Sequence, residues 1–224
     1  MPERSSIFDM IGPVMIGPSS SHTGAVVRIG RTARGLFGEQ AEKVIITFYN
    51  SFSRTYEGHG SDRAILAGLL DMAPDDERIR DSHQHAKDAG LEYHFKVVFN
   101  ASSLHPNAIR IEQFKGEKKQ NVLGISRGGG LISIKEIDGF TCSFSAQVPT
   151  IIFTAKDVHG SIAFITDIIA HEDCNIATMT VDRSGKYDMA KLVLELDSEV
   201  RPLTLEYLRS LDWIENVTYL KPTT

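Results

Sequence analysis

The sequence reads Gly17-Pro18-Ser19-Ser20-Ser21-His22-Thr23-Gly24 directly before its first amphipathic run, so this turn marks the start of a helix. Pro18 stiffens the entry, and the two glycines let another group approach the backbone closely. Free N–H groups at a helix start attract a carboxylate or a phosphate, and the His22 imidazole titrates near neutrality. The stretch therefore indicates an anion site. Serine and threonine are also common N-caps, so an ordinary loop is an equal alternative at this point.

The chain that follows this turn is typical of an α+β unit. Apolar residues at helical spacing predict a helix over residues 23–37 that ends at Gly38. Ser61 and Asp62 open a second helix, with Pro74 beyond its end. We further expect a polar helix at 76–89, and strands at 43–49, 93–99, 109–114, 122–125 and 131–137, with a loop after the first strand. The Gly128-Gly129-Gly130 run is either a hairpin connection or a place where a ligand approaches the backbone.

The pattern changes after Pro149 and gives the element order βαββαβ. Strands are expected at 150–155, 175–181, 190–196 and 217–221, and helices at 160–170 and 203–211. In the first of these helices, the side chains expected to face inward are Ile162, Ile165, Ile168 and Ile169. Gly185 suits a tight hairpin between the two middle strands. We therefore expect an α+β protein of two domains, residues 1–147 and 148–224.

Composition limits the class of protein. The chain has 224 residues, of which 42% are hydrophobic, and a net charge of −5. This hydrophobic fraction is enough for packed cores, and the acidic balance without a basic stripe argues against nucleic acid or a membrane surface as a partner. No apolar run approaches the roughly 20 residues that cross a bilayer, and Met1-Pro2-Glu3-Arg4 leads into no signal-like block. We expect a cytoplasmic protein that acts on small metabolites and binds other proteins.

The chain has two cysteines, Cys142 and Cys174, far apart in the sequence and without a CxxC pattern. Neither a disulfide framework nor a zinc site is indicated, and both thiols are expected to be buried. A four-iron cluster is usually held by three or four thiolates. One copy of this chain therefore has too few cysteines for such a cluster.

Two further segments place a histidine in an unusual setting. Glu57-Gly58-His59-Gly60-Ser61-Asp62 flanks an imidazole with glycines, which leaves the ring accessible. A loop histidine beside an N-cap is the alternative for this segment. Leu104-His105-Pro106-Asn107 combines a histidine with an asparagine that can turn the chain, and it is the less specific of the two.

Several of these segments resemble a known family. Gly12-Pro13-Val14-Met15-Ile16, continued by the serine-rich turn to Ala25, resembles the N-terminal signature of iron–sulfur-dependent L-serine dehydratases, specifically the separate beta subunit of two-chain bacterial forms. Gly58-His59-Gly60-Ser61-Asp62 resembles the family's Gly-His-Gly-Thr-Asp block, with Ser61 in place of threonine. The resemblance implies a lyase of amino-acid metabolism and gluconeogenesis that converts L-serine to pyruvate and ammonia. It also implies a heterodimer with an alpha subunit that carries a four-iron four-sulfur cluster.

The resemblance implies a division of roles between the two subunits. An iron of the partner's cluster acts as a Lewis acid on the departing hydroxyl, while His59 removes the Cα proton and His22 assists it or serves as the acid. The candidates for binding substrate are Ser20, Ser21, Thr23, Gly24, His105 and Asn107. No metal ligand is expected in this chain. Pyridoxal phosphate, the rival cofactor for serine dehydration, is not expected because no lysine lies in a suitable setting.

The second domain resembles an ACT regulatory domain. Its first strand-to-helix junction reads Asp157-Val158-His159-Gly160-Ser161, where N–H groups at the helix start favour a carboxylate and Asp157 suits an ammonium group. The family commonly has proline where this chain has His159. The resemblance implies an allosteric amino-acid site at Asp157, His159, Gly160 and Ser161, or homodimerisation by pairing of sheet edges.

A non-catalytic amino-acid sensor is the alternative function. In that interpretation the second domain binds the ligand and the first transmits the change to a partner. The first domain is also similar to the allosteric substrate-binding domain of some phosphoglycerate dehydrogenases. A sensor accounts for residues 19–23 as well as an enzyme does, but it does not readily account for the His59 segment.

Overall fold

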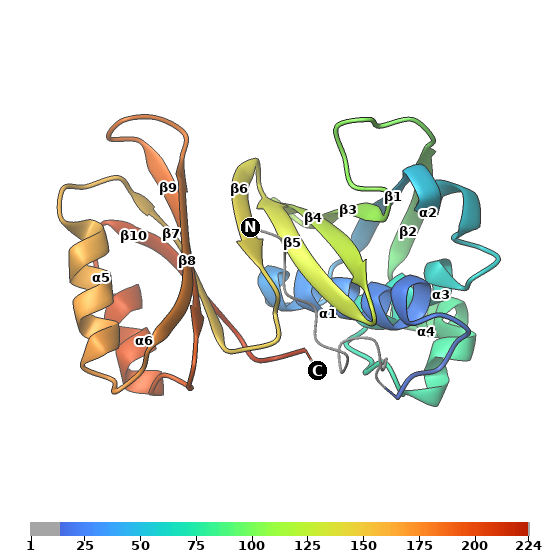
Figure 1. Ribbon diagram of the computed structural model, residues 1–224, viewed down its shortest axis with the longest axis horizontal. Helices are drawn as coiled ribbons and strands as arrows, with labels where there is room; N and C mark the ends of the chain where they lie inside the picture. The colour runs from blue at the N-terminus through green and yellow to red at the C-terminus, as the bar shows by residue number, and fades with distance from the viewer. Residues whose placement is uncertain (1–13, 224) are drawn as a thin grey trace. The chain divides into compact units, whose positions relative to one another are not determined.

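Two compact units make up the structure, a computed structural model that describes residues 14–223 (Figure 1). One unit ends at Asp138 and also includes Thr223, and the other is Gly139–Pro222. Each unit combines helices with β-strands, which confirms the predicted α+β class. Met1-Pro2-Glu3-Arg4 and the Gly12-Pro13 part of the resembling segment lie outside the described residues. Within the described range, no helix has the length and apolar character needed to cross a bilayer.

The first unit is built on a mixed sheet with strand order β2-β1-β3-β4-β5. Its strands are β1 (Lys43–Tyr49), β2 (Glu92–Val98), β3 (Ala108–Lys115), β4 (Lys118–Gly128) and β5 (Leu131–Ile137). Strand β1 is parallel to β2 and antiparallel to β3, and the later pairs are antiparallel. The Gly128-Gly129-Gly130 run connects β4 to β5, with φ angles of 94°, 61° and 82° that favour glycine. The hairpin interpretation of this run is confirmed.

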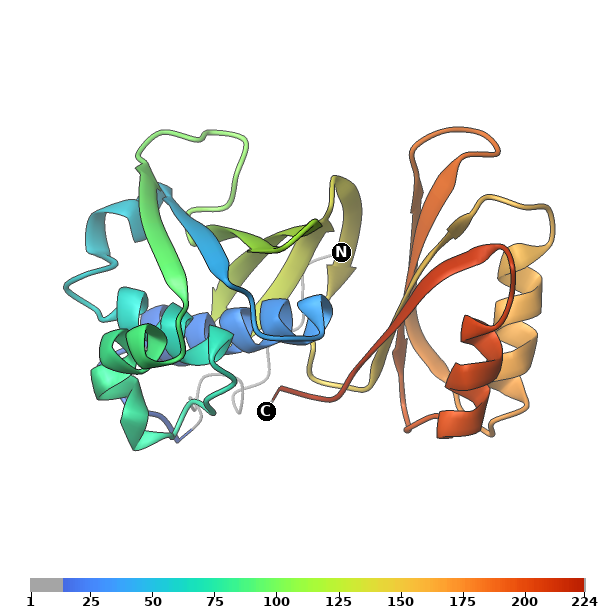
Figure 2. The same cartoon turned by 180° about the vertical axis from the view of Figure 1, so that it is seen from behind.

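Helix α1 (Ala25–Phe37) packs on one face of this sheet (Figure 1 and Figure 2). Its buried apolar residues include Val26, Ile29 and Ala33, as the periodicity predicts, and Gly38 ends it with a φ of 81°. The predicted start at residue 23 is too early. Ser20–Gly24 instead forms one π-helical turn before α1, because Ser19 O accepts from both Thr23 N at 2.8 Å and Gly24 N at 3.4 Å.

Helix α3 (Ser61–Leu69) crosses α1 at a pair of glycines. A Cβ on Gly68 would lie 2.1 Å from Val27 O and 2.9 Å from Gly30 Cα, and a Cβ on Gly30 would lie 2.7 Å from Ile65 O. The two backbones therefore meet where neither helix carries a side chain. This close crossing brings together the helices that follow the serine-rich turn and the Gly-His-Gly segment.

Three elements of the first part of the chain differ from the prediction. Residues expected as a loop after β1 form helix α2 (Asn50–Thr55). The helix expected at 76–89 is a 3₁₀ turn (Glu77–Asp81) followed by helix α4 (Ser82–Asp88), because the Asp76 side chain accepts from Arg78 N and caps the first turn. Strand β4 is longer than predicted, since its polar residues also pair with β3. Strand β6 (Phe140–Phe144), which the sequence did not predict, begins the second unit.

The rest of the second unit has the predicted order βαββαβ. Its elements are β7 (Thr150–Lys156), α5 (Ser161–Ala170), β8 (Ile176–Arg183), β9 (Met189–Leu196), α6 (Pro202–Arg209) and β10 (Ile214–Leu220). The four strands form an antiparallel sheet in the order β10-β7-β9-β8. Both helices cover the same face of this sheet (Figure 1), with a shared apolar core between the two layers.

Two details of this unit correct the sequence interpretation. Ile165 and Ile169 are buried, but Ile162 is 42% exposed because it lies in the first turn of α5, at the margin of the core. The β8–β9 connection is also not a tight glycine hairpin. Five residues separate the strands, and the positive φ of 62° belongs to Tyr187 rather than Gly185.

Candidate functional site

Two hydrogen bonds join the serine-rich turn to the Gly-His-Gly segment. Ser61 Oγ donates to His22 O at 2.6 Å, and Thr23 Oγ1 donates to His59 O at 3.1 Å. Each segment therefore donates one hydrogen bond to a backbone carbonyl of the other segment. Ser61 and Thr23 are both buried, so these bonds are shielded from water.

The local backbone allows this join because Gly60 adopts a positive φ and Gly17 leaves room for the Thr23 side chain. Gly60 has a φ of 68° and precedes the first residue of α3. Gly17 has a φ of 131°, and a Cβ on it would lie 2.4 Å from Thr23 Cγ2. The close approach that the sequence predicted at Gly17 is thus made by a side chain of the same chain.

The join places the His22 and His59 rings next to each other. Their centroids are 4.7 Å apart and their planes are tilted by 34°. The Phe52 and His22 rings make a T-shaped contact with centroids 4.9 Å apart. His59 Nδ1 lies 3.3 Å from Thr55 O. A carbonyl can only accept, so this hydrogen bond puts the proton of a neutral His59 on Nδ1 and leaves Nε2 as an acceptor. An imidazole in that state can take a proton from a substrate.

The hydroxyls of the serine-rich turn surround the other imidazole. His22 Nδ1 lies 3.0 Å from Ser21 Oγ and 3.4 Å from Ser19 Oγ, and these two hydroxyls are 3.2 Å apart. Ser19 Oγ also accepts from His22 N at 3.2 Å. The hydroxyls therefore orient the His22 ring and cap the start of the helix at the same time.

Burial lowers the pKa of His22 below its usual 6.5, and the positive charge of protonated His59 lowers it further. Two imidazoles this close are disfavoured as a doubly protonated pair. Near neutral pH, His22 is therefore uncharged.

The lowered pKa of His22 predicts a pH dependence of stability. The folded chain binds fewer protons at His22 than the unfolded chain, so this contribution is fully present above pH 6.5 and is lost as the pH falls below it. We expect His22→Asn to show a smaller fall in Tm between about pH 7.5 and about pH 5.5 than the wild type. His171→Asn, at an exposed histidine of the second unit, is the matched control and should follow the wild type. Equal falls in Tm for His22→Asn and the wild type would contradict the assignment.

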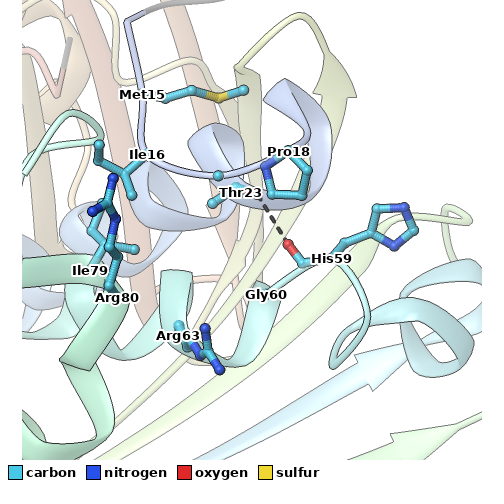
Figure 3. A pocket seen from close by; sticks show the side chains of 10 residues that line it. Met15, Ile16, Pro18, Thr23, His59, Gly60, Arg63, Ile79 and Arg80 are labelled. Atoms are coloured by element: carbon cyan, nitrogen blue, oxygen red, sulfur yellow. Dashed lines mark hydrogen bonds between the residues drawn. The ribbon is translucent and has the colours of Figure 1, made fainter. Parts of the chain in front are cut away.

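A cavity of about 320 Å³ lies on the other side of the Thr23–His59 hydrogen bond (Figure 3). The His59 backbone lines it, while the His59 ring points away from it. Arg63 and Arg80 are its charged lining residues. The site thus has two faces, one with the imidazoles and one with the arginines.

The remaining predicted substrate-binding residues lie around the two segments. Ser20 begins the π-helical turn, and Gly24 is buried at its end. His105 and Asn107 lie in the loop between β2 and β3, which Asn50 holds to the start of α2 by donating to Ala101 O at 3.0 Å. Neither His105 nor Asn107 lines the cavity. Their role in binding substrate stays a prediction.

At the predicted allosteric junction, Asp157 already has partners within the chain. Its Oδ2 accepts from Arg183 Nη1 at 2.9 Å and from Tyr187 N at 3.2 Å, and the Tyr187 N–H and then Arg183 lower its pKa. His159, Gly160 and Ser161 lie beside it at the start of α5, where the cavity is about 30 Å³. That volume holds about one water molecule. An amino acid at this junction therefore needs a rearrangement or a second chain.

The chain's cysteines do not form a cluster site. Cys142 and Cys174 are buried thiols that form no disulfide, and their burial is as predicted for small apolar side chains. Over residues 14–223, no group of three or more His, Cys, Asp or Glu side chains has the proximity needed for a metal ion. The described residues of this chain therefore do not fit a four-iron cluster as its ligands.

Two parts of this site were not predicted from the sequence. One is the pair of arginines at the cavity. The other is a hydrogen-bonded chain in which Asp62 Oδ2 lies 3.0 Å from His83 Nε2, and His83 Nδ1 lies 2.9 Å from Tyr93 Oη. Asp62 directly follows the Gly-His-Gly-Ser segment, so its position in the sequence could have indicated a candidate site residue. His83 and Tyr93 lie in polar or alternating runs, which do not indicate a functional site.

Comparison with known proteins identifies the family of the chain. The family model described as serine dehydratase beta chain matches residues 6–136. The probable L-serine dehydratase beta chain of Bacillus subtilis (strain 168) is 42% identical and covers 95% of this chain and 96% of its own. The L-serine dehydratase beta chain of Peptoniphilus asaccharolyticus is 31% identical and covers 96% of both chains.

One solved structure aligns with part of the chain. The ACT domain from the GTP pyrophosphokinase of Chlorobium tepidum covers 32% of this chain and 95% of its own, at 21% identity and a TM-score of 0.27. A score this low carries no argument, so the ACT assignment stays a prediction. The family model and the two beta chains are decisive by contrast, and they show that this chain belongs to the serine dehydratase beta chain family.

Proposed function

We propose that this chain is the beta subunit of an L-serine dehydratase, which converts L-serine to pyruvate and ammonia. It works with a separate alpha subunit that holds a four-iron four-sulfur cluster. The observation that carries the proposal is the pair of hydrogen bonds that places the His22 and His59 rings 4.7 Å apart. The reaction is inferred from membership of the family, and the two imidazole rings are groups that can transfer the protons of that reaction.

His59 is suited to be the general base. With its Nδ1 proton directed at Thr55 O, its Nε2 lone pair can accept the Cα proton of serine. The electron pair of the Cα–H bond then forms the Cα=Cβ bond, and the Cβ hydroxyl leaves and takes up a proton to become water. The resulting aminoacrylate tautomerises to the imine and is hydrolysed to pyruvate and ammonia.

His22 and the hydroxyl groups are suited to hold the substrate. Ser20 and Ser21 present hydroxyls at a helix start, which favours a carboxylate, and Gly24 ends the same turn. Thr23, whose hydroxyl donates to His59 O, is proposed to fix the position of this turn. A fixed carboxylate sets the direction of the Cα–H bond relative to the base. Uncharged His22 can accept the proton that His59 has taken from Cα and, once protonated, deliver a proton to the departing hydroxyl. His105 and Asn107 complete the proposed substrate site.

Ser21→Ala is expected to raise KM about tenfold by removing one hydrogen bond to a charged group. It should change kcat less, because His59 keeps its bond to Thr55 O. Steady-state kinetics of the assembled enzyme measure both constants, with Ser198→Ala at an exposed position of the second unit as the control. Unchanged KM and kcat would exclude a contact between Ser21 and the substrate.

Reconstitution tests the proposed function directly. The chain is purified anaerobically with iron and sulfide, alone and together with the cysteine-rich alpha subunit, and pyruvate formation from L-serine is followed. We expect activity in the mixture and none in the chain alone. Full activity without iron, or a cluster-loaded mixture with no activity, would overturn the proposal.

The second unit is proposed to be an ACT domain. Its βαββαβ order supports this, and β8 lies at an edge of its sheet with Met179 and Val181 exposed. Such an edge suits pairing with a second copy of the chain. The allosteric ligand proposed for Asp157, His159, Gly160 and Ser161 would then bind where two copies meet, in the cytoplasm.

A further inference from the structure

We infer that the cavity beside the His59 backbone binds a small organic carboxylate, at a place distinct from the face where the two imidazoles meet. Its volume of about 320 Å³ lies at the lower end of the range for small-molecule sites. The inference rests on the charge of the cavity, its apolar wall and its connection to His59.

Among the described residues, the charged side chains that line the cavity are those of Arg63 and Arg80, so its lining is positive. Among residues 14–223, no carboxylate lies within ion-pair distance of Arg63 or Arg80. Of the acidic residues near them in sequence, Asp62 pairs with His83 at 3.0 Å and Asp76 pairs with Arg78 at 2.6 Å. Glu77 and Asp81 are exposed and do not line the cavity. Guanidinium groups bind carboxylates in a bidentate geometry, which favours an anion of this kind.

A part-buried hydrogen bond ties together the two backbone segments that carry the arginines. Ser82, which is fully buried, donates its hydroxyl to Arg63 O at 2.9 Å. Ser82 is two residues from Arg80, so this bond ties the backbone of α3 to the segment that carries the second arginine. The two guanidinium groups therefore extend from a fixed base.

Part of the cavity lining is apolar. It is made by Met15, Ile16, Pro18 and Ile79, of which Ile16 and Ile79 lie on the same side as Arg80 (Figure 3). Ile16 N donates to Pro74 O at 2.8 Å, which holds this wall to the chain beyond α3. A bare inorganic anion leaves such a wall without a partner, whereas an organic acid with a short carbon chain contacts both the wall and the arginines.

The cavity is connected to the proposed base through Thr23. Thr23 lines the cavity and donates to His59 O, while the His59 ring points to the other face (Figure 3). A ligand that displaces Thr23 or the His59 backbone therefore changes the position of the His59 ring. If the proposed function holds, L-serine and pyruvate are both carboxylates of suitable size, and binding of either would link metabolite level to the catalytic face.

Binding to the full chain alone tests this inference without any need for activity. Calorimetry with pyruvate, L-serine and inorganic phosphate is done on the wild type, Arg63→Ala, Arg80→Ala and the control Arg54→Ala, which removes an exposed arginine outside the cavity. We expect pyruvate or L-serine to bind the wild type and the control equally, and each cavity variant about tenfold more weakly. Tighter binding of pyruvate would indicate a product site, and tighter binding of L-serine would indicate a substrate site.

Histidine resonances in NMR separate this cavity from the catalytic face. Ligand addition should shift the His59 ring signal in the wild type, and this shift should be lost in the Arg63→Ala, Arg80→Ala double variant. Carboxylate binding that the two variants leave unchanged would overturn the inference, as would binding of phosphate in preference to both carboxylates. Absence of any carboxylate binding to a folded wild-type chain would overturn it as well, and would leave the reconstitution test of the proposed function unaffected.

Discussion

His59→Ala is expected to lower kcat of the assembled enzyme by about 10²- to 10⁴-fold, the usual loss when a general base is removed. The acceptor at Nε2 disappears with the ring, which the hydrogen bond from Nδ1 to Thr55 O orients in the wild type. Turnover of L-serine measures the effect. Binding to the alpha subunit and the absorbance of its cluster should be unchanged, because the variant removes no cluster ligand from this chain.

The same variant has a second readout that a purely structural role would not produce. Protonated His59 is one of the two causes of the low pKa of His22, so its removal should raise the pKa of His22 towards 6.5. NMR titration of the His22 ring follows this shift, with His171→Ala as the control. Normal turnover in His59→Ala, together with an unchanged His22 titration, would remove His59 from the reaction.

Gly68→Ala is expected to reduce the free energy of unfolding of the first unit by about 3 kcal/mol, the upper part of the usual range for overpacking. The new Cβ would lie 2.1 Å from Val27 O and 2.8 Å from Arg31 N, and these are backbone atoms that cannot move aside. Alanine gains about 1 kcal/mol of helix propensity over glycine. A contact this short outweighs that gain.

The single tryptophan makes this prediction specific to one unit. Trp213 lies in the second unit, so its fluorescence reports unfolding there, while circular dichroism reports both units. We expect Gly68→Ala to lower the Tm of the circular dichroism transition and to leave the tryptophan transition in place. Gly185→Ala, where a Cβ meets nothing closer than 3.7 Å, is the matched control. An unchanged circular dichroism transition would show that α1 and α3 do not cross at these glycines.

Periodicity predicted the elements whose side chains alternate between core and solvent. Strand β5 has its predicted bounds, and α1 ends at Gly38 as predicted. Helix α2 was missed because residues 50–55 include Asn, Ser and Thr, which are weak helix formers. Tertiary hydrogen bonds stabilise this helix, since the Asn50 side chain also accepts from Ala101 N at 2.8 Å. Such a contact between distant residues leaves no local pattern.

The candidate site was likewise predicted from the sequence only in part. The two histidines were predicted because each lies in a distinctive local setting. Their proximity could not be predicted, because it depends on Ser61 and Thr23 reaching carbonyls more than thirty positions away. Arg63 and Arg80 gave no signal, since exposed arginines are common on helices and only the fold places them at one cavity.

The reciprocal bonds of Thr23 and Ser61 have a consequence for assembly. Both bonds form within one polypeptide, so the loss of chain entropy needed to bring the imidazoles together occurs during folding. An incoming alpha subunit then meets a preorganised surface, and its association energy is not consumed in arranging these groups. Complex formation should accordingly proceed as rigid docking, at a rate set by encounter rather than by rearrangement of this chain.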